Sequence, residues 1–146
     1  MQLAEASLTF QTIHFDAADR LVNTTQILAY LTDRIPAIPT ESFWILCLNP
    51  NRRPICRIKI ATSNLVTTRV SVRDIILPTL LAEGKGLVCL RTQPEGLVRP
   101  NLADGRLMFT VQQACRLMGI EFLDYLIARL DQRDCYSCRQ HGELHD

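Results

Sequence analysis

The sequence predicts an α/β domain in which helices flank a mixed β-sheet. Two observations lead to this class. Short apolar stretches that fit strands alternate with longer stretches whose apolar residues recur at helical spacing. Their order is helix, two strands, helix, strand, helix, two strands, which favours a sheet with helices packed on it. A length of 146 residues fits one domain. We interpret residues 1–19 as an N-terminal extension and residues 20–146 as the domain.

The first half contains one predicted helix and a strand pair. Asn23-Thr24-Thr25-Gln26 is typical of a helix start, with Asn23 as the cap and Gln26 as the third helical residue. Residues 42–49 are apolar and aromatic, as in a buried strand. Turn residues at 50–53 lead to an alternating strand over 55–61, so the two strands are expected to form a hairpin. Before the helix, His14 lies in a polar segment with no predicted strand.

The second half contains two predicted helices and three strands. Ser71 with Asp74 three residues later indicates a helix start, and Gly84 marks its end. Pro78 inside this helix is expected to kink or shorten it. The remaining elements are a strand over 86–90, a loop over 91–100, a helix over 102–118 that ends at Gly119, and strands over 122–130 and 134–137.

Cysteine usage and hydropathy bear on location. Of the six cysteines, Cys47, Cys89 and Cys115 lie inside apolar periodic segments, where cysteine acts as a small hydrophobe. Reduced thiols are therefore expected rather than disulfides. No apolar run approaches the ~18 residues needed to cross a membrane, and residues 1–5 lack the basic and apolar regions of a signal peptide. We expect a cytoplasmic protein without membrane contact.

The charge is unevenly distributed along the chain. The net charge is +1, but residues 51–106 hold ten Lys or Arg and four Asp or Glu, a local +6. Such a region could attract phosphate or an acidic partner; a rim of solvated loop arginines is the simpler interpretation. The sequence contains no helix-turn-helix, aromatic stacking motif or Gly-Lys phosphate loop that would support nucleic-acid binding.

Several short motifs carry a resemblance to a known family. The most specific is the stretch from Arg91-Thr92-Gln93-Pro94-Glu95-Gly96 to Pro100-Asn101-Leu102-Ala103-Asp104. It resembles the His-Asn-His-Pro-Ser-Gly and Pro-Ser-x-x-Asp motifs of the RadC-like branch of the JAB/MPN (JAMM) metalloprotease family. Further segments resemble family motifs in the same order: 41–49, 61–65, 70–75, 117–127, and Tyr136-Ser137 with Gly142. Within 117–127, Tyr125 stands where the family motif has a histidine. The resemblance covers about residues 20 to 144 and implies a three-layer fold like that of cytidine deaminase.

The resemblance also implies which residues occupy the metal site of the family. Arg91 and Gln93 stand where two histidines bind zinc, Asp104 stands at the third ligand, and Asn101 replaces a serine. Glu41 is the counterpart of the general base. Arginine offers only hydrogen-bond donors, and an amide oxygen is a poor zinc ligand. The resemblance therefore implies a degenerate site without cofactor, metal or assignable catalytic residue.

Three functions follow as hypotheses from this resemblance. The first is a non-catalytic binding or scaffold domain that acts through a protein partner or as a homodimer. The second is a metal-dependent hydrolase, a JAMM-type peptidase, with non-standard ligands. A hard cation held by Glu41, Gln93 and Asp104 is a separate alternative for the same residues. The third is an accessory protein in DNA repair, with nucleic acid as its partner.

The role of Arg91 has two interpretations. Its guanidinium could replace the charge of the metal and pair with Asp104 or Glu41, because unpaired buried carboxylates are costly. Alternatively, Arg91 points to solvent and Asp104 only caps the helix that follows Asn101.

A second group of possible metal ligands lies near the C-terminus. Cys135, Cys138, His141 and His145 resemble a zinc knuckle in residue type. Residues three apart on a strand point to opposite faces, however, so we expect no metal there. Phe43 and Trp44 are expected in the core or at a dimer contact.

Overall fold

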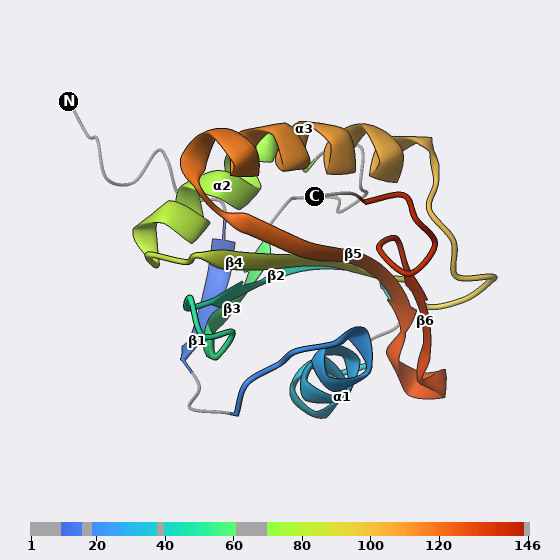
Figure 1. Ribbon diagram of the computed structural model, residues 1–146. Coiled ribbons are helices and arrows are strands. Elements are labelled where there is room, and N and C mark those ends of the chain that lie inside the picture. Colours follow the sequence, from blue (N-terminus) through green and yellow to red (C-terminus); the bar gives the residue numbers. More distant parts are fainter. Residues whose placement is uncertain (1–9, 16–18, 38–39, 61–69, 145–146) are drawn as a thin grey trace.

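A computed structural model describes residues 10–15, 19–37, 40–60 and 70–144, the first of these ranges as backbone alone. Its elements are β1 (Phe10–Phe15), α1 (Thr24–Arg34), β2 (Ser42–Leu48), β3 (Pro54–Ile60), α2 (Val72–Leu81), β4 (Gly86–Thr92), α3 (Leu102–Met118), β5 (Glu121–Arg129), a 3-10 turn (Leu130–Gln132) and β6 (Asp134–Ser137). The strands form one sheet in the order β1-β3-β2-β4-β5-β6. Helix α1 covers one face, and α2 and α3 cover the other (Figure 1). The predicted three-layer α/β class is confirmed.

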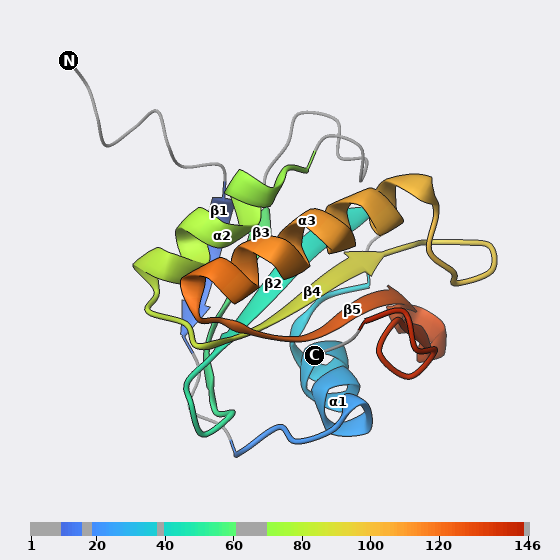
Figure 2. The same cartoon turned by 45° about the horizontal axis from the view of Figure 1, so that its top comes forward.

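The sheet is mixed because one connection between neighbouring strands is a helical crossover. β2 pairs antiparallel with β3 and β4, and β5 pairs antiparallel with β6. β4 and β5 are parallel, and parallel neighbours need a crossover, which here is α3. Figure 2 shows α3 lying across the sheet between the end of β4 and the start of β5. This crossover places the loop after β4 beside the first turn of α3.

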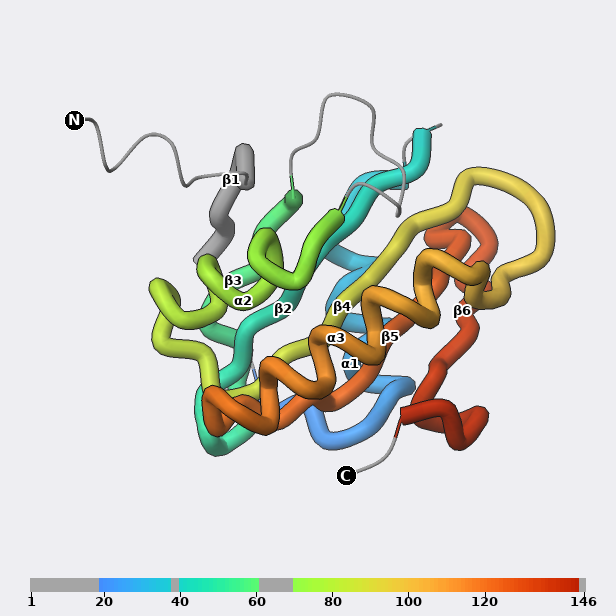
Figure 3. The backbone as a smooth tube through the Cα atoms, turned by 90° about the horizontal axis from the view of Figure 1, so that it is seen from above, coloured from blue at the N-terminus to red at the C-terminus, as the bar shows by residue number. Residues whose placement is uncertain are grey.

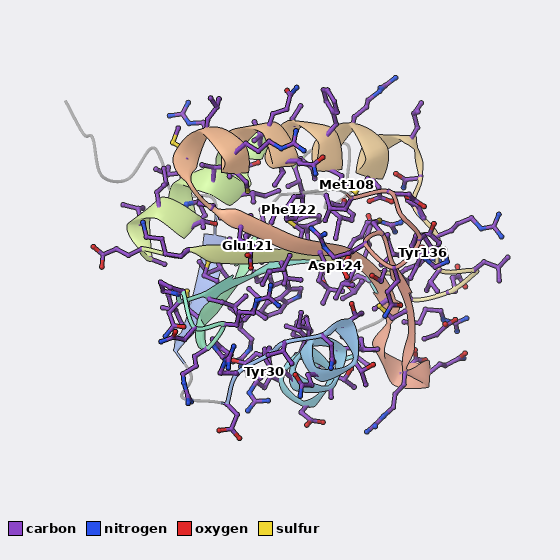
Figure 4. All side chains as sticks on the ribbon, in the orientation of Figure 1. Tyr30, Met108, Glu121, Phe122, Asp124 and Tyr136 are labelled. Carbon is purple, nitrogen blue, oxygen red and sulfur yellow. The ribbon has the colours of Figure 1, made fainter. Side chains whose placement is uncertain are left out.

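The two sides of the sheet bury separate hydrophobic clusters. Along β2, Phe43, Ile45 and Cys47 pack on the side of α2 and α3, whereas Trp44 and its alternate neighbours pack on the side of α1. Both faces are covered, so the strand is apolar from Phe43 to Leu48. Figure 4 labels Phe122 and Met108 on the α3 side and Tyr30 on the α1 side. The expectation that Phe43 and Trp44 lie in the core is confirmed.

Asp124 on β5 joins three elements. Its carboxylate is buried and accepts hydrogen bonds from the Thr24 hydroxyl of α1 at 3.0 Å and from the Ser137 hydroxyl of β6 at 2.5 Å. It also accepts the backbone N–H of Arg139 at 3.1 Å. Figure 4 shows Asp124 on the strand between these elements. The contacts fix α1 and the C-terminal segment to the sheet.

Helix ends follow local sequence signals. The Asn23 side chain accepts the N–H of Gln26 at 2.9 Å, while the Gln26 side chain accepts the N–H of Val22 instead of closing the box on Asn23. Ser71 and Asp74 form a reciprocal capping box at the start of α2. Gly119 ends α3 in the left-handed region, at φ 69°, a conformation that glycine adopts without steric cost.

The structure corrects three expectations. β1 is a strand that was not predicted, and it pairs with β3 from Phe10 opposite Ile60 to Phe15 opposite Cys56. α2 is not ended by Pro78 but continues to Leu81, three residues before Gly84, and the N–H of Ala82 bonds to the Pro78 carbonyl at 2.9 Å.

The third correction concerns the end of β4. The strand extends through Arg91 to Thr92, two residues beyond the predicted loop boundary, because β2 and β5 pair with it to that point. The motif at 61–65 lies outside the described residues. None of the helices in the described part of the chain is long and apolar enough to span a membrane.

Candidate functional site

The candidate site lies where β2 begins and β4 ends, beside the first turn of α3. Arg91 and Gln93 are two residues apart and therefore project to the same side of the sheet, which α3 covers. Arg91 lies opposite Phe43 on β2, and Phe43 follows Glu41 by two residues. Asp104 is the third residue of α3. Figure 3 shows β4 leading into the loop that returns to the start of α3. The fold thus brings together the predicted residues Glu41, Arg91, Gln93, Asn101 and Asp104.

Arg91 is at the centre of this group and is only 4% exposed. Its Nε and Nη2 donate to the two carboxylate oxygens of Asp104 at 2.9 and 2.7 Å. Its Nη1 donates to Glu41 Oε1 at 3.2 Å and to Gln93 Oε1 at 3.1 Å. Nη2 also donates to the backbone carbonyl of Arg99 at 3.3 Å. A guanidinium has five N–H donors, and all five are used.

Asp104 is 1% exposed and accepts from three directions. Besides the bidentate pair with Arg91, it accepts the hydroxyl of Tyr125 at 2.7 Å. It also accepts the N–H of Asn101 at 2.8 Å, while its own N–H donates to Asn101 Oδ1 at 2.8 Å. The structure therefore agrees with the first interpretation, in which Arg91 pairs with Asp104 and Glu41. The alternative, in which Arg91 points to solvent, is wrong, although Asp104 does cap α3 as well.

Burial and charge keep Arg91 cationic. Burial alone would lower the pKa of Arg91, but the hydrogen bond and the charge of Asp104, with the charge of Glu41, outweigh it, and the pKa is raised. The Glu41 side chain is 24% exposed. The ion pair with Asp104 is therefore fully buried, whereas the pair with Glu41 reaches solvent.

Tyr125 on β5 is a site residue that the sequence prediction missed. It is fully buried, and its ring meets Phe43 edge to face, with ring centroids 6.1 Å apart. Burial, followed by the charge and hydrogen bond of Asp104, raises the pKa of Tyr125. The phenol therefore stays protonated and donates. The available signal was that tyrosine replaces histidine in the family pattern at this position.

Gln93 holds the loop that follows the site. Its Nε2 donates to the carbonyls of Glu95 at 2.9 Å and Leu97 at 2.7 Å, and Gly96 between them has φ 84°. A cleft of about 490 Å³ lies on the other side of this loop, towards α1, and is lined by Pro36, Ala37, Thr92, Gln93, Pro94, Glu95, Leu130 and Asp131. Of the residues hydrogen-bonded in the Arg91 network, Gln93 lines this cleft, whereas Arg91, Asp104 and Glu41 do not.

The donor set at the network does not fit a catalytic zinc ion. Such an ion takes about three protein ligands and keeps one position open for water. Here only Glu41 and Asp104 supply anionic oxygens, and both are hydrogen-bonded to Arg91. Across residues 19–37, 40–60 and 70–144, no three His, Cys, Asp or Glu side chains are grouped as metal ligands.

The C-terminal Cys and His residues are placed apart. Cys135 packs with the cluster beneath α1, whereas Cys138 is buried in the cluster beneath α3, as expected for residues on opposite faces. His141 stacks on Tyr136 with ring centroids 3.9 Å apart. His145 lies outside the described residues. The six cysteines are free thiols, and Cys47, Cys89 and Cys115 are buried as predicted.

The sequence of the chain matches a known protein family. Residues 21–143 match the profile of the family described as the RadC-like JAB domain. A UPF0758 protein of Coprothermobacter proteolyticus is 30% identical over 92 residues, which cover 63% of this chain and 39% of that protein. One of Photorhabdus laumondii is 25% identical over 140 residues, covering 96% and 60%. One of Haemophilus influenzae is 30% identical over 97 residues, covering 66% and 43%. The chain thus spans between 39% and 60% of the length of these relatives.

Proposed function

Because the chain belongs to the RadC-like JAB domain family, we propose that it is a non-catalytic member, a binding domain in which the Arg91 guanidinium takes the place of the metal ion. The observation that carries the proposal is the complete use of the Arg91 donors. Five N–H groups meet five acceptors on Glu41, Gln93, Arg99 and both oxygens of Asp104. A metal ion at this place would first have to displace a paired and hydrogen-bonded cation.

Electrostatics support the same conclusion. A buried carboxylate without a cation is costly, and removing one partner of a buried ion pair costs about 3–5 kcal/mol. Arg91 provides the positive charge that Asp104 requires, in the bidentate geometry that a guanidinium matches best. Glu41, the counterpart of the general base, accepts from Arg91 at 3.2 Å. In a zinc hydrolase that carboxylate would face a metal-bound water.

A role in binding follows from what this fold retains. The hydrolytic machinery is replaced, yet the first turn of α3 and the loop after β4 remain held together by buried hydrogen bonds. A network of this kind stabilises the fold and the surfaces around it. We propose that the domain contributes a surface for another protein, and that it neither hydrolyses peptides nor carries zinc.

Zinc titration of designed variants tests this proposal. We expect no measurable zinc affinity in the wild type. We expect affinity to appear in Arg91→His with Gln93→His and Asn101→Ser, because the loop length and Asp104 are intact. Arg91→His alone is the matched control, since it opens the site but supplies only one new ligand. Zinc binding by the wild type that is lost in Asp104→Asn, together with peptidase activity, would contradict the proposal.

A variant that folds but binds no zinc would show that the loop no longer has the geometry of the family site. Circular dichroism of each variant separates this outcome from misfolding. Arg91→His has a second use here, because its stability relative to the wild type reports the exchange of the guanidinium for a single imidazole.

A further inference from the structure

The outer surface of α2 and α3 differs from the rest of the molecule in its exposed apolar residues. Six of the eight large hydrophobic side chains that are exposed among the described residues lie on these two helices, namely Leu80, Leu81, Leu102, Phe109, Leu117 and Met118. Leu117 is 84% exposed and Phe109 is 60% exposed. Helix α1, on the other face, has none within the described part of the chain. Exposed apolar residues that gather in this way mark an interaction surface.

The groove between the two helices consists of two separate clefts, one at each end of the line along which the helices meet. α2 and α3 lie side by side over the sheet (Figure 3). At their N-terminal ends a cleft of about 330 Å³ has Val70, Val72 and Leu107 in its lining and Arg106 at its wall. At their C-terminal ends a cleft of about 410 Å³ is bounded by Leu80, Met118 and Ile120. The helices are therefore parallel, and each end of the line between them has a cleft with apolar side chains in its lining.

The exposed charges of α2 and α3 are basic, and Arg106 lies at the N-terminal cleft. The exposed charged residues of the two helices are Arg73, Arg106 and Arg116. The helices hold only two acids, and both serve capping boxes: Asp74 bonds to the N–H of Ser71 at 2.9 Å, and Asp104 is buried against Arg91. Beyond the helices, Glu83 and Lys85 lie at the C-terminal cleft and offset each other.

We infer that the groove between α2 and α3 binds a protein segment that is helical, apolar on one face and acidic along its edges. The inference rests on the proposed binding role and names the surface and the partner chemistry. Amphipathic helices commonly dock through their apolar face into a hydrophobic groove. α2 has 10 residues, so a helix of similar length, about 15 Å, would fit beside it. Acidic residues on the partner would pair with the arginines and set its orientation.

Charge distinguishes this partner from two others. A second copy of the chain would bring Arg73, Arg106 and Arg116 against the same basic residues, and like charges in an interface are unfavourable. Duplex DNA would satisfy the arginines, but interfaces with DNA are polar and strongly basic. Such an interface would leave the exposed leucines and Phe109 without apolar partners.

A labelled synthetic peptide tests the inference directly. The probe is a 15-residue helical peptide, roughly one groove length with an added turn, with leucine on one face and glutamate on the flanks. Fluorescence anisotropy should show saturable binding to the full chain. Arg106→Glu and Leu117→Ser should each weaken it about tenfold or more. Both side chains are exposed, so these variants should fold.

Controls separate this groove from general stickiness. Arg133→Glu and Val22→Ser change exposed residues away from α2 and α3 and should leave the peptide affinity unchanged. A peptide with lysine in place of glutamate should not bind. Absence of binding by the acidic peptide, equal binding of the lysine peptide, displacement by duplex DNA, or dimerisation abolished by Leu117→Ser would each overturn the inference. The zinc titration is independent of all these readouts, so failure here and failure of the proposed function are distinguishable.

Discussion

Replacing Arg91 with methionine removes the buried cation while keeping a side chain of similar length. Asp104 then loses its bidentate partner and keeps the Tyr125 hydroxyl at 2.7 Å and the Asn101 N–H at 2.8 Å. Loss of one partner of a buried pair costs about 3–5 kcal/mol. Because two donors remain and Glu41 can turn towards water, we expect a loss near the lower end, about 3 kcal/mol. At about 2–4 °C per kcal/mol for a chain of this size, the melting temperature should fall by about 6–12 °C.

Equilibrium unfolding in urea is the assay for this prediction. The single tryptophan, Trp44, is 6% exposed in the fold and reports unfolding by fluorescence. Asp104→Asn combined with Arg91→Met should recover part of the loss, because the uncompensated charge is gone. The double-mutant cycle should give a coupling energy within about 0.5–3 kcal/mol, as for contacting residues. Arg106→Met, an exposed arginine on α3, should stay within about 0.5 kcal/mol of wild type. Small and additive effects of both site substitutions would refute the buried-pair reasoning.

Two further predictions concern other groups. Tyr125→Phe removes a donor to Asp104 and should cost about 1.5–3 kcal/mol at neutral pH. The pKa of Tyr125 is raised by burial and Asp104. In the unfolded chain the Tyr125 phenol ionises at about pH 10, whereas in the folded chain it stays protonated there. The free energy of unfolding should therefore fall above that pH. In urea melts above that pH, the free energy of unfolding of the wild type should fall by up to about 1.36 kcal/mol per pH unit more than that of Tyr125→Phe. The same pH dependence of stability in both proteins would contradict this. Burial raises the pKa of the Cys115 thiol to about 12. All of the cysteines except Cys135 are buried. A disulfide reagent at pH 8 should therefore titrate the six thiols rapidly only in denaturant; rapid modification in the native state would count against this packing.

Local sequence signals predict much of the fold. α3 has the predicted bounds because Asn101 and Asp104 form a capping box and Gly119 permits a left-handed end. β1 was missed because its strand state depends on pairing with β3, which is distant in the chain. The end of β4 was placed too early because a charged residue usually marks the surface, whereas Arg91 is buried by its side-chain partners.

The site residues could be named from the sequence only through the resemblance of residues 91–104 to the family motifs. The family motifs single out Arg91, Gln93 and Asp104, and the fold brings these three residues into contact. Spacing alone could not decide between capping and pairing for Asp104, and the structure shows both. Tyr125 comes from another strand, so its hydrogen bond to Asp104 is a tertiary contact with no local signal. The single hint was its substitution for a family histidine.

Elemental analysis of the purified chain tests the central claim most directly. If Arg91 takes the place of the metal, zinc should be present at far less than one ion per chain, both after purification and after incubation with zinc followed by desalting. The same treatment of Arg91→His with Gln93→His and Asn101→Ser should raise the zinc content towards one. About one zinc per wild-type chain, lost in Asp104→Asn, would contradict the account.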